Sequence, residues 1–221
     1  MLDATACVLV TGFEPFDQDP LNPSWEVARA LDGWVCEGVP VRALKLPCVF
    51  GLAAERLDQA LREHRPQLVV GLGLATGRSE WQPERVAINC DDARIADNAG
   101  RQPIDTAVVP GGPAAYFSTL PIKAIVQALR ASSLPASVSN SAGTFVCNHG
   151  FYALMHALST HGALSGARGG FVHVPCLPEQ AARHPGVPSM ALDTQVQALR
   201  VLLQTCLRVR EDTRVTGGQI H

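Results

Sequence analysis

The 221-residue sequence has no apolar run close to the roughly 20 residues that a helix needs to cross a bilayer. Its first residues lack the basic segment and the long apolar stretch of a secretory signal peptide. It also lacks a surplus of charge of one sign: the net charge is −2, and acidic and basic residues are scattered, which gives no footprint for nucleic acid. We therefore expect a protein that binds neither membranes nor nucleic acid.

The seven cysteines include no Cys-x-x-Cys pair, which argues against a zinc site and against a dithiol redox centre. The acidic pair Asp91-Asp92 has no histidine or third acid at ligand spacing, so we predict no metal site. The odd number and wide spacing of the cysteines favour free thiols in a reducing cytoplasm. Free cysteines are usually buried and inert, so a special role requires special surroundings.

Hydrophobic residues make up 47% of the chain and charged residues 17%, which is typical of a globular protein. We predict a single domain over residues 1–221, with a loose C-terminal tail from about residue 210. Apolar, β-branched runs predict strands at residues 7–11, 39–46, 67–73, 85–89, 136–139 and 170–174. Periodic segments predict helices at residues 22–33, 52–64, 122–129, 150–158 and 192–207. This alternation indicates an α/β fold, a three-layer α/β/α domain with a mostly parallel central sheet.

Small, hydroxyl-bearing and glycine residues in the segment 139–146 lead directly to Cys147, and an apolar, helix-like run follows. A thiol at a helix start faces unpaired N–H groups and the positive end of the helix dipole, and both favour the reactive thiolate. The same amides could stabilise a tetrahedral oxyanion. An inert structural cysteine is the alternative, and the residues alone leave both interpretations open.

A cysteine nucleophile needs a base, most often histidine. His149 would point to a different face of a helix from Cys147, whereas His173 interrupts a buried apolar strand near its end. A buried imidazole is costly unless it is hydrogen-bonded, so His173 is either a satisfied core residue or the base. The imidazole also needs an orienting carboxylate or amide, for which Glu84 is a candidate. By pattern alone, a surface ion pair between Glu84 and Arg85 is the simpler interpretation.

Two further features are ambiguous. Arg94 follows the acidic pair Asp91-Asp92, which indicates either a solvated turn or an arginine that points at a carbonyl or an anion. Phe13 and Phe16 lie three positions apart in a chain with only 5% aromatics. They suggest a small apolar pocket, although ordinary core packing explains them equally well.

Several stretches together resemble the pyroglutamyl peptidase I (pyrrolidone-carboxylate peptidase) family. They are residues 10–16 with 22–24, 84–89, 92–95 with 97–98, 141–149 and 171–175. The stretch 141–149, Ser-Ala-Gly-Thr-Phe-Val-Cys-Asn-His, is long and specific. The resemblance extends from near the N terminus into the final third of the chain.

The resemblance implies a cofactor-free cysteine peptidase that removes an N-terminal pyroglutamyl (5-oxoproline) residue from peptides, through a thioester acyl-enzyme. It implies that Cys147 is the nucleophile and His173 the base, with Glu84 as the orienting acid. Arg94 would lie on the side of the site where the oxyanion forms. The implied substrate-binding residues are Phe13, Phe16, Asn22, Leu74, Ile95 and Val146. The resemblance also implies a homotetramer in the cytosol.

One position departs from the family pattern. The family commonly reads Gly-Gln-Ala-Gly-Gly-Arg where this chain reads Gly73-Leu-Ala-Thr-Gly-Arg78. A substrate contact through the backbone carbonyl of Leu74 would tolerate the change, whereas a contact through the lost amide would not. This departure leaves open a homologue that keeps the pocket but has lost or altered its lactam specificity. A separate alternative is a related α/β hydrolase or phosphorylase that acts on another lactam or on a nucleoside, and a nucleoside phosphorylase would need an anion site but no reactive cysteine.

Overall fold

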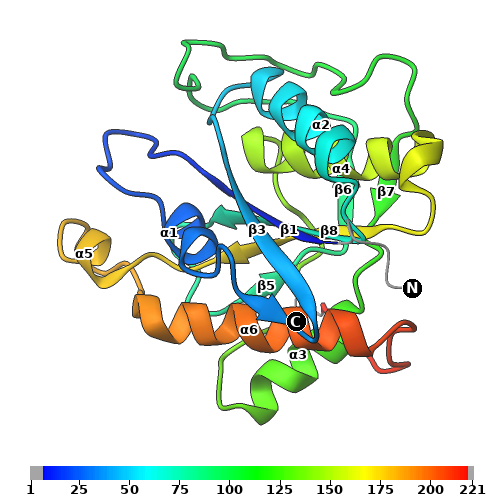
Figure 1. Ribbon diagram of the computed structural model, residues 1–221. Helices are drawn as coiled ribbons and strands as arrows, with labels where there is room; N and C mark the ends of the chain where they lie inside the picture. Colours follow the sequence, from blue (N-terminus) through cyan, green and yellow to red (C-terminus); the bar gives the residue numbers. More distant parts are fainter. Residues whose placement is uncertain (1–6, 219–221) are drawn as a thin grey trace.

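The computed structural model describes residues 7–218 and is built on a six-stranded sheet (Figure 1). Its strands are β1 (Val8–Phe13), β2 (Val35–Cys36), β3 (Val39–Leu46), β4 (Leu68–Leu74), β5 (Gln82–Pro83) and β8 (Arg168–Val174). They lie in the order β2-β3-β1-β4-β8-β5. The four central strands are parallel, and only the two short edge strands run antiparallel to their neighbours. The predicted mostly parallel sheet is confirmed.

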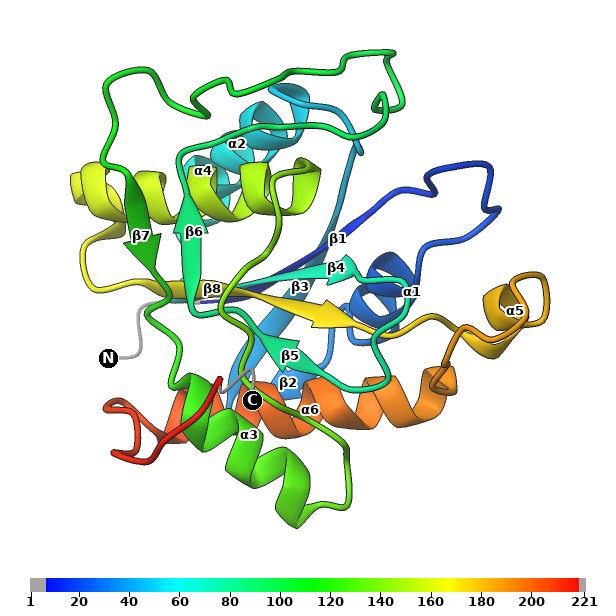
Figure 2. The same ribbon diagram turned by 180° about the vertical axis from the view of Figure 1, so that it is seen from behind.

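Helices cover both faces of this sheet (Figures 1 and 2). One face carries α1 (Pro23–Ala30), α3 (Ile122–Ala131) and α6 (Leu192–Arg208), and the other carries α2 (Leu52–His64) and α4 (Val146–Thr160). A separate two-stranded ribbon joins β6 (Val86–Ile88) to β7 (Ala115–Phe117). The short helix α5 (Pro178–Ala181) and a 3-10 turn at Gly162–Leu164 complete the elements of the described residues. The three-layer α/β/α architecture is therefore confirmed.

The core divides into two clusters because successive strand residues point to opposite faces of the sheet. On β1, Val8 and Val10 pack beneath α1, α3 and α6, whereas Leu9 and Phe13 belong to the cluster beneath α2 and α4. Residues of both clusters are almost entirely excluded from solvent. Within residues 7–218, no helix is both long and apolar enough to cross a membrane.

The start of α1 follows the sequence signal closely. Asn22 caps the helix by accepting a hydrogen bond from the Ser24 amide at 3.1 Å, and Pro23 occupies the first turn. The helix packs unusually near the sheet, since a Cβ added to Gly12 would lie 2.4 Å from the Ser24 carbonyl oxygen. Glycine is therefore required at position 12 for this approach.

The predicted strand at residues 136–139 is not a regular strand. It forms only isolated bridges, which pair Trp81 with Ala136 and Glu84 with Ser139. Its neighbouring segment contains Pro83, which accepts from the Ser139 amide but has no N–H to return. The missing donor interrupts the ladder.

Residues 209–218, the described part of the chain after α6, have no regular secondary structure but are tied to the domain. Asp212 accepts hydrogen bonds from the amides of Lys123 (3.1 Å) and Ala124 (2.9 Å) in the first turn of α3. The Gly217 carbonyl accepts from Arg85 at 2.8 Å. The predicted loose tail covers residues 210–221, of which 219–221 lie outside the described residues.

Candidate active site

Three elements bring the candidate catalytic residues to one end of the sheet. Cys147 is the second residue of α4, and His173 is the penultimate residue of β8. Glu84 lies between β5 and β6. Gly143, with φ of +77°, allows the chain to turn sharply before α4. The site lies at the carboxyl end of a parallel strand, where ligands of open α/β sheets are bound.

Glu84 and His173 form a buried pair. The Nδ1–H of His173 donates to Glu84 Oε1 at 2.7 Å, and the side chains are 5% and 0% exposed respectively. The carboxylate thereby fixes the tautomer and leaves Nε2 free to act as a base. The predicted surface ion pair between Glu84 and Arg85 is wrong, because Arg85 bonds instead to Asn140 at 2.7 Å and to the Gly217 carbonyl.

Cys147 lies against the strand position next to His173. In the parallel register of β4 and β8, Gly73 is the partner of His173. A Cβ added to Gly73 would lie 2.8 Å from Cys147 Sγ and 2.7 Å from Phe171 Cζ. Phe171 and His173 share one face of β8, the face that α4 covers. The absence of a side chain at position 73 therefore makes room for the thiol.

We expect Gly73→Ala to destabilise the fold by about 1–3 kcal/mol, since overpacking a filled core forces side chains out of place. It should also displace Cys147 and remove activity. Gly162→Ala is the matched control, because a Cβ there meets nothing within 4 Å. Thermal unfolding and thiol alkylation of both variants check this prediction. A Gly73→Ala variant that reacts and melts like wild type would contradict the close packing.

The position of Cys147 at a helix start is not enough to make its side chain a thiolate in the resting protein. The pKa of Cys147 is raised to about 12: burial is the largest cause, the negative charge of Glu84 adds to it, and the positive charge of Arg78 partly offsets both. Burial and the Glu84 charge therefore outweigh the effect that the sequence predicts for the helix start. The proton must be transferred to a base before or during attack.

The first turn of α4 presents free amides beside the thiol. The helix has Phe145 as N-cap, and no side chain caps it. The first bond that closes the helix runs from the His149 amide to the Phe145 carbonyl at 3.1 Å, so the amides of Val146, Cys147 and Asn148 precede the intrahelical ladder. These amides are suited to hold an oxyanion that forms on a substrate carbonyl attacked by Sγ.

His149 is fully engaged elsewhere and is not placed as a base. Its Nδ1–H donates to Asp91 Oδ2 at 2.8 Å, and its Nε2 accepts from the Gly51 amide at 3.0 Å. The Asp91 side chain is 6% exposed and that of His149 is 7% exposed. The pair ties the start of α4 to the loop before α2.

A small apolar cavity of about 120 Å³ opens beside the thiol. It is lined by Phe13, Phe16, Asp19, Leu21, Asn22, Cys48, Leu74, Thr76, Phe145, Val146 and Cys147. Five of the six residues implied by the family resemblance as substrate-binding are in this lining. The lining residues that the sequence did not reveal are Asp19, Leu21, Cys48, Thr76 and Phe145. Of these, Phe145 lies within the stretch 141–149 and Thr76 within the stretch 73–78, both of which were compared with the family.

Most of the hydrogen-bonding capacity of the Asn22 side chain is used within the protein. Its side-chain oxygen accepts from the Ser24 amide and hydroxyl, and its Nδ2 donates to the Glu14 carbonyl at 3.0 Å. One N–H of the amide remains to face the cavity. Leu74 is the last residue of β4 and presents an apolar side chain to the same cavity.

Arg94 and Ile95 do not line this cavity. Arg94 is exposed, and Ile95 is half-buried. Their loop is nevertheless anchored next to the nucleophile, because the Asp92 amide donates to the Thr144 carbonyl at 2.9 Å and the Thr144 hydroxyl donates back to the Asp92 carbonyl. The role predicted for Arg94 at the oxyanion remains a prediction.

Arg78 is a member of the site that the pattern analysis missed. Its guanidinium donates to Glu84 Oε1 at 2.8 Å and to the Ser141 carbonyl at 3.3 Å. The signal was present, because Arg78 closes the Gly73–Arg78 stretch that was compared with the family pattern.

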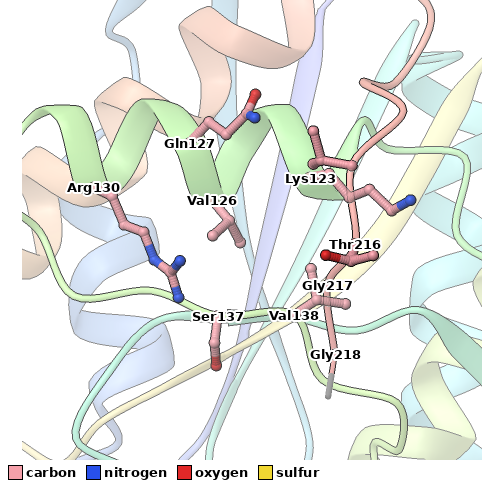
Figure 3. A pocket seen from close by; sticks show the side chains of 10 residues that line it. Lys123, Val126, Gln127, Arg130, Ser137, Val138, Thr216, Gly217 and Gly218 are labelled. Atoms are coloured by element: carbon pink, nitrogen blue, oxygen red, sulfur yellow. The ribbon is translucent and has the colours of Figure 1, made fainter.

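A larger hollow of about 450 Å³ lies elsewhere, between α3 and the C-terminal segment (Figure 3). Its walls carry Lys123, Arg130 and Ser137, but none of the three candidate catalytic residues. No group of three or more histidine, cysteine and acidic side chains that could hold a metal occurs among residues 7–218.

The comparisons with known proteins agree over nearly the whole chain. The family model of pyroglutamyl peptidase matches residues 6–209. A pyrrolidone-carboxylate peptidase of Ralstonia nicotianae is 62% identical over 214 residues, which cover 97% of this chain and 99% of the relative. A pyrrolidone-carboxylate peptidase of Klebsiella pneumoniae is 56% identical over 216 residues, with coverages of 98% and 100%.

Solved structures give the same result. The crystal structure of pyroglutamyl peptidase I from Bacillus amyloliquefaciens superposes with a TM-score of 0.91 at 42% identity, covering 94% of this chain and 100% of that chain. A mutant pyrrolidone carboxyl peptidase from the hyperthermophile Pyrococcus furiosus gives a TM-score of 0.88 at 42% identity, with coverages of 91% and 98%.

Proposed function

The chain belongs to the pyroglutamyl peptidase family, and we propose that Cys147, His173 and Glu84 carry its activity. It is a cysteine peptidase that removes an N-terminal pyroglutamyl residue. The observation that carries the assignment of roles is the position of the Cys147 thiol: it lies at a helix N terminus, against the strand position beside the Glu84–His173 pair, and it lines an apolar cavity.

The reaction begins with proton transfer from the Cys147 thiol to His173 Nε2. Sγ then attacks the pyroglutamyl carbonyl, and the amides at the start of α4 stabilise the oxyanion. On the loop anchored to Thr144, Arg94 adds positive charge to that side. The tetrahedral intermediate collapses with cleavage of the C–N bond, and protonated His173 gives its proton to the departing amine. Water then hydrolyses the thioester and releases pyroglutamate.

The cavity supports selectivity for a lactam. Pyroglutamate has no amino-terminal charge, so it can enter an apolar cavity walled by Phe13, Phe16 and Val146. An ordinary peptide would have to bury an ammonium group there, which is costly because Asp19, the acid in the lining, is already paired with Arg183. The spare N–H of Asn22 is a donor for the lactam carbonyl. Ile95, whose loop is held near the thiol, would contact the substrate at the mouth of the cavity.

Hydrolysis of pyroglutamyl and prolyl chromogenic amides by the full-length protein tests this function. We expect cleavage of the pyroglutamyl amide and no measurable cleavage of the prolyl amide, whose five-membered ring lacks the lactam carbonyl and has a charged nitrogen. A folded protein that cleaves neither would contradict the proposal. Cleavage of a nucleoside that requires phosphate and survives thiol alkylation would instead favour the nucleoside phosphorylase alternative.

The pH dependence of thiol alkylation tests the state of Cys147. In His173→Gln, the rate of alkylation by iodoacetamide should rise about tenfold per pH unit through pH 10, because a thiol pKa raised to about 12 leaves the thiolate fraction still growing. The unfolded protein is the control, and its rate should level off near its ordinary thiol pKa of 9.0. A plateau near that value in the folded variant would contradict the raised pKa.

The protein's location and assembly follow from the family resemblance and remain to be measured. All seven cysteines are free thiols, which supports a reducing compartment such as the cytoplasm. We propose that four copies assemble into a homotetramer, and light scattering of the purified protein would measure its mass. N-terminally pyroglutamylated peptides are the proposed partners.

A further inference from the structure

Glu84 carries a charge that the fold must compensate. Its side chain is 0% exposed, and its Oε2 is buried without a hydrogen-bond partner among the described residues. A buried, unpaired carboxylate is strongly destabilising. Three titratable or charged side chains from the described elements act on it: Arg78 from the loop after β4, His173 from β8 and Cys147 from α4. Of these, only Arg78 carries a permanent positive charge.

Arg78 and His173 bond to the same carboxylate oxygen. The guanidinium lies 2.8 Å from Glu84 Oε1, and His173 Nδ1 lies 2.7 Å from that atom. The second arm of the guanidinium reaches the carbonyl of Ser141, in the loop that leads to Cys147. Arg78 therefore connects the orienting acid to the segment that positions the nucleophile.

We propose that Arg78 is a positioning residue of the peptidase: it pairs with the buried Glu84 carboxylate, keeps it aimed at His173, and holds the loop before Cys147 in register with that pair. The inference rests on the proposed function. The thiol provides independent support, because the negative charge of Glu84 raises the pKa of Cys147 and the positive charge of Arg78 lowers it. Arg78 thus offsets the cost that an orienting carboxylate imposes on a neighbouring thiol.

Replacement of Arg78 by methionine should lower kcat/KM for a pyroglutamyl amide by about 10- to 100-fold, the range found when a residue that orients a metal ligand through a hydrogen bond is lost. It should also slow alkylation of Cys147 at neutral pH and shift the rate-versus-pH curve to higher pH. Arg78→Lys keeps the charge and should recover much of both losses. The full-length chain is used throughout, and mass spectrometry identifies the alkylated cysteine.

Arg85→Met is the matched control, because Arg85 adjoins Glu84 in sequence but bonds to Asn140 and Gly217. It should retain wild-type values in both assays. In a Glu84→Gln background, Arg78→Met should cause little further loss, since the charge that Arg78 compensates is gone. This second comparison also covers the case in which Arg78→Met alone does not fold.

Three results would overturn the inference: wild-type kcat/KM and alkylation profile in Arg78→Met, losses as large in Arg85→Met, or an undiminished effect of Arg78→Met beside Glu84→Gln. Failure of the proposed function can be distinguished from failure of this inference, because a wild-type protein without peptidase activity still gives an alkylation profile. In that case the dependence of the profile on Arg78 continues to test the charge arrangement.

Discussion

Cys147→Ala should lower kcat/KM for a pyroglutamyl chromogenic amide by about 10⁴-fold or more, because the acyl group then has no atom to which it can be transferred. The first-turn amides of α4 and the cavity would remain, so substrate should still bind. The side chain that is lost is small and partly exposed, and we expect the variant to melt close to wild type. Activity and thermal unfolding measured on the same preparation separate loss of chemistry from loss of fold.

Cys90→Ala provides the matched control. Cys90 is also a partly exposed free cysteine, but it does not line the cavity. Its replacement should leave hydrolysis unchanged and leaves Cys147 as the remaining partly exposed cysteine. Hydrolysis that persists in Cys147→Ala at more than a trace would remove Cys147 from the mechanism, whatever its position on α4.

His173→Gln should lower kcat/KM by about 10²- to 10⁴-fold, the range expected for the loss of a general base and acid. The raised pKa of Cys147 makes this dependence strong, since the thiol does not ionise near neutral pH without an acceptor for its proton. Glutamine can still donate to Glu84 from its amide, so the buried carboxylate keeps a partner. The variant should therefore fold, and its defect should appear in kcat more than in KM.

His156→Gln is the corresponding control, because His156 lies on α4, the helix that carries Cys147, but pairs with the Tyr116 hydroxyl at 2.9 Å. We expect wild-type activity from it. Equal losses in the two histidine variants, or none in His173→Gln, would contradict the assignment of His173 as the base.

The sequence could identify Cys147 and His173 as candidates because the features that single them out are local in the chain. A helix start after a glycine turn, and a histidine near the end of an apolar strand, are both visible in a short window. Local pattern could not choose between His149 and His173, since the partners of His149 are Asp91 and Gly51, far from it in the chain.

Glu84 and Arg78 show what local pattern could not reveal. Neighbouring charges in a sequence suggest an exposed pair, and only the tertiary fold turns Glu84 inward and Arg85 outward. The family resemblance gave Glu84 the role of orienting acid in place of a surface ion pair, but it gave no role to Arg78. The partial exposure of Arg78, 28% of its side chain, gives no hint of a buried partner.

The fold was predictable where periodicity was strong. The strands at residues 39–46 and 67–73 and the helix at residues 52–64 agree closely with the structure. Prediction failed where tertiary contacts decide, as at residues 136–139, where Pro83 interrupts the ladder, and at the short β7, which pairs only with β6. Leu52, the first residue of the helix predicted at residues 52–64, is 47% exposed although it is apolar.

The most direct test of this account is to identify the acylated residue during turnover. Wild-type protein mixed with a pyroglutamyl chromogenic amide is quenched in acid, digested and analysed by mass spectrometry. We predict a pyroglutamyl group on Cys147 and on none of the other six cysteines, with the label gone once substrate is exhausted. Steady hydrolysis with no label on Cys147, or with the label on a different residue, would contradict the assignment of Cys147 as the nucleophile.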